Sequence, residues 1–304
     1  MHRREDVERY VIKEQALDFE ERSETYLQSV WRRFKRHKLG KISLILFTVL
    51  LILALLAPVL APNDPNRILS APGSAPSEKF LLGTDLSGRD VFSRLFYGAR
   101  ISLLVGILVT LMSTILGVVL GLVAGYYGGA VDTVIMRFTD MIMSFPYMLL
   151  VLMFAAIFEP GLWNIIIILG VVNWPGIARL VRGNVLSLRE TTYIKRSMIQ
   201  GLSRRHILFS EILPNTVAPI LVYSTSVMAY SVLDEAALSF IGMGVQPPTA
   251  SLGNMLGDAK SLTVLVEKPW LWVPSGILII LMVMSINFIG DGLRDALDPA
   301  SSRS

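Results

Sequence analysis

Long uncharged apolar runs constrain this chain more than any other feature. A helix needs roughly 20 apolar residues to cross a bilayer, and the sequence offers candidate runs at residues 42–63, 101–131, 141–158, 160–178, 212–233, 236–257 and 269–290. Because 53% of the residues are hydrophobic and only 17% are charged, the chain carries more apolar surface than a single globular core uses. The composition therefore indicates a multi-pass membrane protein.

The run 236–257 is the exception among these candidates. It contains Gly242, Gly244, Pro247, Pro248 and Gly253, and a lipid-exposed backbone broken this often loses its internal hydrogen bonds. We predict that this segment dips into protein or into the interface without crossing. The expected fold is an all-α integral membrane protein with six transmembrane helices, near residues 42–62, 101–124, 135–158, 162–181, 215–239 and 271–291.

The distribution of Lys and Arg predicts the orientation of these helices. Six spans place both termini on one side, and cytoplasmic loops carry the excess of basic residues. With the N-terminus inside, the inner segments hold more than twice as many Lys and Arg residues as the outer ones. We therefore expect an N-in, C-in topology. The clusters beside the spans also explain the net charge of +4, so nucleic-acid binding is not needed to account for it.

This topology divides the chain into five parts. None of the pieces outside the spans is large enough to fold on its own, so soluble machinery must come from partners. The expected parts are a cytoplasmic tail at 1–41, a first span at 42–62, an external loop at 63–100, a transmembrane core at 101–291 with a cytoplasmic loop at 189–214, and a cytoplasmic tail at 292–304.

The external loop ends in a patterned stretch at residues 83–100, GTDLSGRDVFSRLFYGAR. Two Gly/Asp turns precede a helix that Asp90 is expected to cap, with apolar residues along one face. Two interpretations remain open. The stretch is either an amphipathic connector held on the membrane by Asp/Arg pairs, or a docking surface for an external partner.

Several kinds of chemistry are not expected in this chain. A phosphate-binding loop needs Ser or Thr directly after its Gly-Lys pair, but the pair at 40–41 is followed by Ile42. The three histidines, His2, His37 and His206, are too far apart to form a zinc-binding pair, and there is no cysteine. We expect no enzymatic activity, no metal and no cofactor in this chain.

Four carboxylates lie within or at the ends of the spans: Asp140, Asp234, Glu235 and Asp291. Burying a charge in lipid is costly, so such residues are functional candidates. Asp140 and Asp291 are placed to face the cytoplasmic interface. Asp234 and Glu235 lie about 30 Å beyond the start of the fifth span, where they either line a translocation pathway or are solvated near the outer surface. A proton-coupled secondary transporter using Asp140, Asp234 or Glu235 remains an alternative.

A charged segment interrupts the apolar runs before the fifth span. Residues 193–200 are compatible with a short helix, which Gly201 is suited to cap, and Ser203 is suited to cap a second helix running to Leu213. Pro214 cannot continue that helix with normal hydrogen bonding, so it either ends the helix or is absorbed at the start of the next span. We predict a helix-turn-helix on the cytoplasmic face, which acts either as a connector or as a lever for a moving partner.

This segment resembles the coupling loop of the permease subunits of bacterial ABC importers of the dipeptide, oligopeptide and nickel type. That loop carries Glu-Ala-Ala, three residues, Gly, nine residues and then Ile-x-Leu-Pro. Gly201, Leu213 and Pro214 match at the correct spacing. The sequence Lys-Arg-Ser at 195–197 stands where the family has Glu-Ala-Ala, and Glu211 stands where the family has Ile.

Other stretches resemble the same family. Residues 83–100 are similar to its external loop, and residues 235–248, EAALSFIGMGVQPP, are similar to the exit of its fifth span. The following Ser-Leu-Gly at 251–253 has Leu where the family often has Trp. Residues 290–299, GDGLRDALDP, resemble its C-terminal signature. The resemblance runs from about residue 31 to residue 299.

The resemblance implies a subunit of the bacterial inner membrane that forms half of a translocation pathway. It implies a second permease subunit, two cytoplasmic ATPase subunits that bind ATP and Mg²⁺, and an external solute-binding protein. Peptides are the expected substrate, with oligosaccharides or nickel as alternatives. The residues that it assigns to ATPase coupling are Tyr193, Lys195, Arg196, Ser197, Gly201, Arg204, Glu211, Leu213 and Pro214.

Overall fold

The computed structural model describes residues 26–297 of the 304-residue chain. The outer parts of both predicted tails, residues 1–25 and 298–304, lie outside the described residues. Within the described part the chain is helical, with one isolated bridge between Thr84 and Asp90. The α-helices are α2 (Tyr26–Arg36), α3 (Lys38–Leu55), α4 (Ala57–Leu60), α5 (Val91–Tyr127), α6 (Gly129–Ser144), α7 (Tyr147–Ile157), α8 (Leu162–Arg189), α9 (Thr192–Ile199), α10 (Arg204–His206), α11 (Leu213–Ile241), α12 (Leu252–Leu256), α13 (Leu262–Glu267) and α14 (Val273–Leu297).

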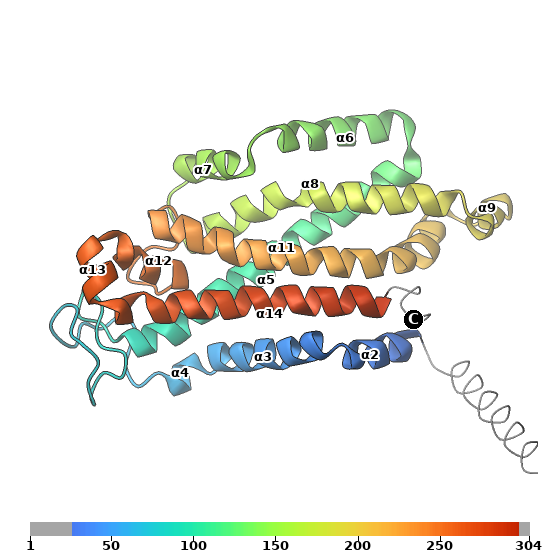
Figure 1. Ribbon diagram of the computed structural model, residues 1–304. Helices are drawn as coiled ribbons and strands as arrows, with labels where there is room; N and C mark the ends of the chain where they lie inside the picture. The colour runs from blue at the N-terminus through green and yellow to red at the C-terminus, as the bar shows by residue number, and fades with distance from the viewer. Residues whose placement is uncertain (1–25, 298–304) are drawn as a thin grey trace, which may run out of the picture.

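Five of these helical stretches are long and apolar enough to cross a membrane: α3, α5, α8, the continuous stretch Arg204–Ile241 and α14. Figure 1 shows α3, α14, α11 and α8 lying one above another, with α6 and α7 on top. The prediction of an all-α protein with apolar spans is therefore confirmed. Whether the number of spans is five or six depends on α6 and α7.

The predicted third span, residues 135–158, is not one straight helix. α6 and α7 meet at an angle of 89°. Pro146 has no N–H to donate, and Phe145 before it is extended, with φ −85° and ψ 143°, as a residue before proline prefers. The proline thus breaks the helix inside the apolar run, which corrects the expected boundaries of this span.

The helix that contains the predicted second span begins before that span. α5 starts at Val91, ten residues before the expected position, because the carboxylate of Asp90 accepts a 3.2 Å hydrogen bond from the N–H of Ser93 and caps the helix there. The predicted cap at Asp90 is confirmed. The helix that follows it continues directly into the membrane-spanning stretch, so the amphipathic connector is the first part of α5 and not a separate surface helix.

Three glycines let α5 approach α8 closely. A Cβ atom on Gly117 would lie 2.5 Å from Ile177, one on Gly121 would lie 2.6 Å from the carbonyl oxygen of Ala178, and one on Gly125 would lie 2.7 Å from the Cβ of Val185. The glycines recur every four residues and so share one helix face. Small residues at this spacing are typical of membrane helices packed backbone to backbone.

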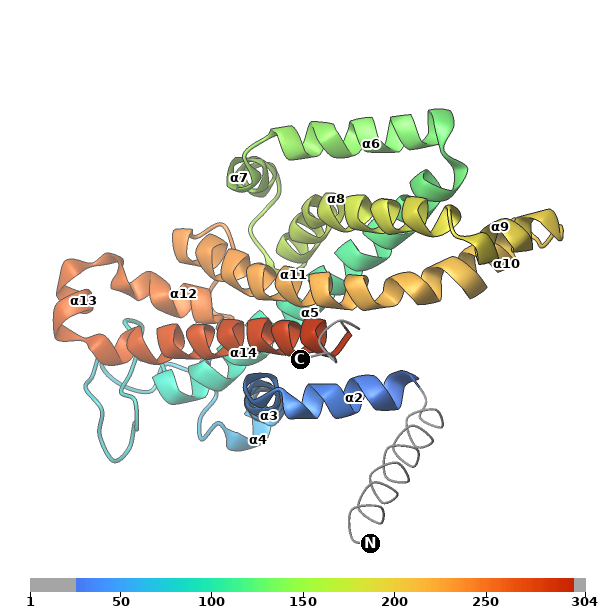
Figure 2. The ribbon, with the colours of Figure 1, turned by 45° about the vertical axis from the view of Figure 1, so that its right-hand side comes forward.

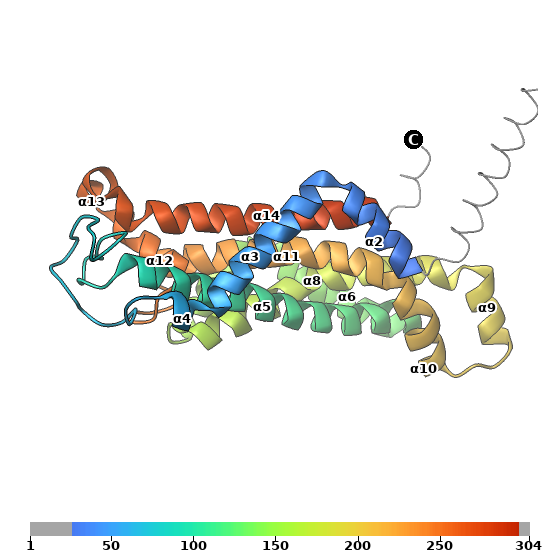
Figure 3. The same ribbon diagram turned by 90° about the horizontal axis from the view of Figure 1, so that it is seen from below.

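The segments between the spans gather at the two ends of the helix bundle. The views in Figures 1 to 3 place α2, α9, α10 and the C-terminal end of α14 at one end, and the loop 61–90 with α12 and α13 at the other. The segments predicted to face the cytoplasm therefore share one end of the molecule.

The run 236–257 does not cross the bundle. α11 continues to Ile241, and Gly242 then ends it in the left-handed conformation with φ +93°. A turn leads to α12 of five residues. This agrees with the prediction that the segment folds against the protein without spanning.

Candidate functional site

The predicted coupling segment forms a hairpin that projects from one end of the bundle, where α9 and α10 are labelled in Figure 3. Gly201 follows α9 with φ +76°, and its N–H donates to the carbonyl oxygen of Met198 at 3.1 Å. The hydroxyl of Ser203 accepts a 3.3 Å hydrogen bond from the N–H of His206 and caps α10. Both predicted caps, Gly201 and Ser203, are thus confirmed.

Pro214 does not end the second helix; it is absorbed at the start of the next span, which is one of the two outcomes that the sequence left open. α10 is followed by a π-helical turn at Ile207–Ile212, in which the N–H of Leu213 donates to the carbonyl oxygen of Leu208, and α11 begins at Leu213 without a break. Pro214 lies in the first turn of α11. A proline in a continuous helix requires a local change in backbone pairing, and a widened turn is one such change. The second helix of the hairpin is consequently the start of the fifth span itself.

The hairpin is anchored by buried isoleucines and exposes apolar side chains beside its basic ones. Ile194, Ile207 and Ile212 are buried in one apolar cluster with Val181 and Val185 of α8. In contrast, Ile199 is 87% exposed. The other exposed large apolar residues of the hairpin are Tyr193, Met198, Leu202 and Phe209. Exposed apolar patches rimmed by polar residues mark interaction sites, so the tip of the hairpin is a candidate partner-binding surface.

Charged groups on and near the hairpin make specific contacts. Lys195 forms a 2.8 Å ion pair with Glu190, and this hydrogen bond and charge hold the pKa of Glu190 below its ordinary value. The guanidinium of Arg204 lies 5.8 Å from the ring centre of Tyr127. Glu211 has one buried carboxylate oxygen, Oε2, that accepts no hydrogen bond from the described residues.

The nine predicted coupling residues therefore belong to one continuous stretch. Tyr193, Lys195, Arg196 and Ser197 lie on α9, Gly201 lies at the turn, and the remaining four follow from α10 into α11. The structure brings them together at the end of the bundle that also holds α2.

A second candidate site is a cavity between α7, α8 and α11. It has a volume of about 300 Å³ and is lined by Tyr147, Asn173, Tyr223, Tyr230 and Asp234, among others. The hydroxyl of Tyr147 donates a 2.6 Å hydrogen bond to Oδ2 of Asp234, and the amide of Asn173 donates a 3.0 Å hydrogen bond to the hydroxyl oxygen of Tyr147. Three separate segments thus meet around one carboxylate.

An adjoining cavity of about 210 Å³ shares Tyr147, Asn173 and Tyr223 with the first. Most of its other lining residues are apolar: Ile142, Met143, Phe145, Leu150, Val172 and Pro175. The bend between α6 and α7 places residues on both sides of Pro146 in this lining. One acidic and one apolar cavity therefore lie next to each other.

Glu235 is not part of this cavity, which corrects the expectation that it lines a pathway beside Asp234. It is completely buried, and its carboxylate accepts hydrogen bonds from the hydroxyls of Ser102 at 2.6 Å and Ser239 at 2.7 Å. Successive residues on a helix point about 100° apart, so the two neighbours face different surroundings. Glu235 joins α5 to α11 inside the bundle.

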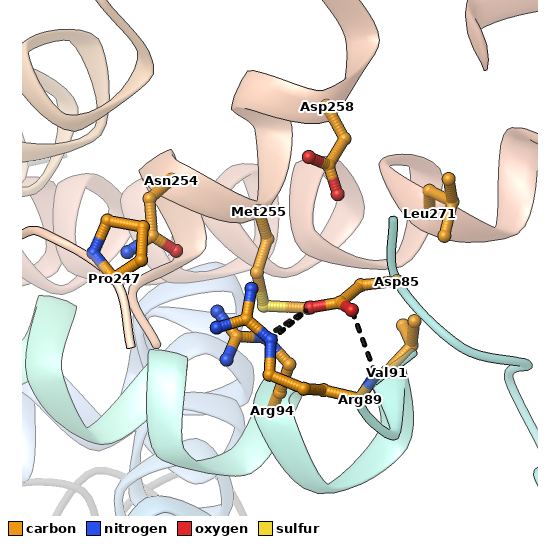
Figure 4. Close-up of a pocket in the computed structure, with 9 residues that line it drawn as sticks. All are labelled: Asp85, Arg89, Val91, Arg94, Pro247, Asn254, Met255, Asp258 and Leu271. Atoms are coloured by element: carbon orange, nitrogen blue, oxygen red, sulfur yellow. Dashed lines mark hydrogen bonds and ion pairs between the residues drawn. The ribbon is translucent and has the colours of Figure 1, made fainter. Parts of the chain in front are cut away.

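At the opposite end of the molecule, ion pairs fasten the loop that was predicted to be external (Figure 4). The carboxylate of Asp85 lies 2.7 Å from Nε of Arg89 and 3.3 Å from Nε of Arg94. Arg94 also donates to the carbonyl oxygens of Pro65 at 3.0 Å and Pro248 at 3.1 Å. The loop, α5 and the segment after α11 are thereby linked, as the connector interpretation of residues 83–100 requires.

Asp258 lines the same pocket, which has a volume of about 60 Å³. Burial, followed by the nearby negative charge of Asp85, raises the pKa of Asp258 to about 6. The positive charges of Arg94 and Arg89 oppose this effect. Asp258 therefore changes its charge under mildly acidic conditions.

Sequence reasoning identified Asp234 but missed the other residues of its cavity. Tyr147, Asn173, Tyr223 and Tyr230 are uncharged and come from three helices, so no local pattern unites them. In contrast, the Asp/Arg pairs of the predicted external loop could be expected from the sequence, because Asp85 and Arg89 are close to each other in the chain.

Comparison with known proteins agrees with this architecture. Residues 117–303 match the family described as binding-protein-dependent transport system inner membrane component, and residues 25–76 match the N-terminal TM domain of oligopeptide transport permease C. A dipeptide transport system permease protein DppC of Alkalihalophilus pseudofirmus is 40% identical over 90% of this chain and 89% of its own length. The DppC of Haemophilus influenzae is 39% identical over 90% of this chain and 95% of its own length.

A di/tripeptide transport system permease protein DppC of Pseudomonas aeruginosa is likewise 40% identical, over 90% of this chain and 92% of its own length. Because the family model covers more than half of the chain and these relatives cover most of it, membership does not depend on the coupling loop alone. The chain belongs to the family of binding-protein-dependent transport system inner membrane components, the permease subunits of ABC transporters.

Proposed function

We propose that this chain forms half of the translocation pathway of an ATP-driven importer of dipeptides and oligopeptides. The observation that carries the proposal is the identity of about 40% with relatives named for dipeptide or di/tripeptide transport, over nine-tenths of this chain. The assembly contains a second permease subunit, two ATPase subunits that bind ATP and Mg²⁺, and a solute-binding protein outside the membrane. This chain carries out no hydrolysis itself.

In this proposal the chain crosses the bacterial inner membrane six times, with both termini in the cytoplasm. α6 and α7 together count as the third span. The grouping of α2, α9 and α10 at one end supports this orientation (Figure 3), because these helices carry many of the basic residues. The external loop at the other end then faces the solute-binding protein.

The projecting hairpin is the proposed ATPase contact. ATP can shift the pore only by its difference in affinity for the two states, so the contact must transmit movement without yielding. The burial of Ile194, Ile207 and Ile212 supports this role, since it fixes the hairpin to α8 and α11. The proposed coupling residues are Tyr193, Lys195, Arg196, Ser197, Gly201, Arg204, Glu211, Leu213 and Pro214.

Reconstitution of the whole assembly tests the proposal. The two permeases and two ATPases are purified together, inserted in liposomes, and supplied with the binding protein loaded with peptide, oligosaccharide or Ni²⁺. We expect ATP-dependent uptake of peptide and stimulation of ATP hydrolysis by the peptide-loaded binding protein. If only the binding protein loaded with oligosaccharide or Ni²⁺ stimulates ATP hydrolysis, the substrate is an oligosaccharide or nickel and not a peptide. Uptake that survives inactivation of the ATPases and collapses with the proton gradient would contradict the ATP-driven mechanism.

A further inference from the structure

Asp234 has no cationic partner among the described residues, unlike the two paired carboxylates of α6, and unlike the buried Glu235 it lines a cavity. Asp132 and Asp140 of α6 pair with Arg182 and Arg179 of α8, respectively. In the part of the chain that the structure describes, no ion pair involves Asp234. Carboxylates within membrane spans are almost always paired, and an unpaired one is a functional candidate.

The surroundings of Asp234 favour a cation supplied from outside the chain. Tyr147 donates to Oδ2, while Oδ1 accepts no hydrogen bond from the described residues. The rings of Tyr223 and Tyr230 line the same cavity, and aromatic faces attract alkylammonium groups. A carboxylate with a free oxygen between tyrosines is therefore suited to bind an ammonium group.

The adjoining cavity adds a second requirement that the ligand must meet. It continues past Tyr147, Asn173 and Tyr223 into apolar surroundings, so a ligand that fills both cavities carries a positive charge next to an apolar group. The volumes of about 300 and 210 Å³ suit a small ligand or one end of a longer one. The amino-terminal residue of a peptide has this chemistry, because its ammonium and its side chain leave the same carbon atom.

We propose that Asp234, Tyr223 and Tyr230 form a subsite for the terminal ammonium group of the transported peptide, and that the apolar cavity beyond Tyr147 receives the first side chain. The inference rests on the proposed peptide import. It goes further by assigning part of the substrate contact to this chain, in addition to whatever selection the binding protein makes.

The test measures the equilibrium binding of two probes to the complete membrane complex in lipid nanodiscs, without binding protein. Saturation-transfer NMR detects the binding. The two probes are leucyl-alanine and 4-methylpentanoyl-alanine, which has hydrogen in place of the ammonium group. We expect the wild type to bind leucyl-alanine about tenfold more tightly, equivalent to about 1.4 kcal/mol. Asp234→Asn should bind the two probes equally, and Asp234→Glu should keep part of the preference.

Asp140→Asn is the matched control, since it neutralises a carboxylate that already has an arginine partner. We expect it to leave the preference for leucyl-alanine unchanged. The proposal is overturned if the wild type binds both probes equally, if leucyl-alanine shows no saturable binding, or if Asp234→Asn keeps the preference.

Two other occupants of the site give distinct results. If a basic residue of the second permease subunit pairs with Asp234, neutralising Asp234 will disrupt assembly of the complex and no ammonium preference will exist in the wild type. If a proton is the partner, a protonophore will abolish ATP-driven uptake. Either result overturns the inference. Peptide uptake by the reconstituted assembly is measured separately, so the inference can fail while the proposed function stands.

Discussion

Lys195 of α9 holds Glu190, which follows the end of α8, in a 2.8 Å ion pair. Under the resemblance described above, Lys195 stands where the coupling loop of the family has an acidic residue, so we expect the charge there to be reversed. We expect the ATPase partner to present an acidic groove to the segment at 195–196. Lys195→Glu should lower ATP-coupled uptake about tenfold, because like charges across an interface cost on the order of 1.4 kcal/mol or more.

The measurement is uptake by the reconstituted assembly at equal expression, with Lys195→Gln as the neutral control. The neutral variant should fall between the wild type and Lys195→Glu. Improved coupling in Lys195→Glu would show that the expected acidic groove does not exist.

Gly201 is the joint of the hairpin, and Gly201→Pro should uncouple ATP hydrolysis from uptake. Proline requires φ near −65° and has no N–H, whereas Gly201 has φ +76° and donates to Met198. We expect at least a tenfold loss of uptake while the assembly still inserts and hydrolyses ATP. Gly201→Ala keeps the N–H and meets no neighbouring atom within 4 Å, so its effect should be smaller. Normal uptake by Gly201→Pro would contradict the lever role.

The glycine face of α5 makes a prediction about stability. Gly121→Ala places a Cβ atom 2.6 Å from the carbonyl oxygen of Ala178, which forces the two helices apart. Overpacking of this kind costs about 1–3 kcal/mol. Thermal unfolding in detergent should show a lower Tm. Gly183→Ala on α8 is the control, since its new methyl group meets no atom within 4 Å. Equal Tm values for the two variants would show that the close approach is not needed.

Asp258 makes stability depend on pH at the end of the molecule that holds α12 and α13. Its pKa is raised from 3.8 to about 6, so the folded protein binds the proton more tightly than the unfolded chain does. The stability contributed by protonated Asp258 is therefore lost as the pH rises from about 4 to about 6. Asp258→Asn should raise the Tm by more at pH 7.5 than at pH 4.5. The same increase in Tm at both pH values would show that ionisation of Asp258 does not cause the pH dependence of stability.

Local signals in the sequence predicted the helix caps but not the path of the backbone between them. Asp90, Gly201 and Ser203 act as predicted, because a cap depends on residues within one turn. Pro146 was not recognised as a break within the third apolar run, although proline disrupts a helix interior. For Pro214 the sequence left two outcomes open, and the structure shows that the helix continues past it through a π turn. Surrounding structure decided which proline interrupts its helix.

The candidate pathway shows the same limit. Asp234 and Glu235 are adjacent and carry the same charge, so the sequence offered no reason to separate them. In the fold, Glu235 is buried against Ser102 and Ser239, whereas Asp234 meets Tyr147. Residues next to each other on a helix face different neighbours, and only the packing of the other helices identifies those neighbours.

The sequence by itself determined that the chain is helical, that it carries several apolar spans, and that its basic residues gather beside them. These properties depend on local composition and on transfer of each segment into a bilayer. Only the tertiary structure decided that Asp132 and Asp140 pair with Arg182 and Arg179 while Asp234 lacks a cationic partner among the described residues. The reason is physical: charge pairing depends on distances between helices that are about 40 or more residues apart in the chain, and composition does not specify those distances.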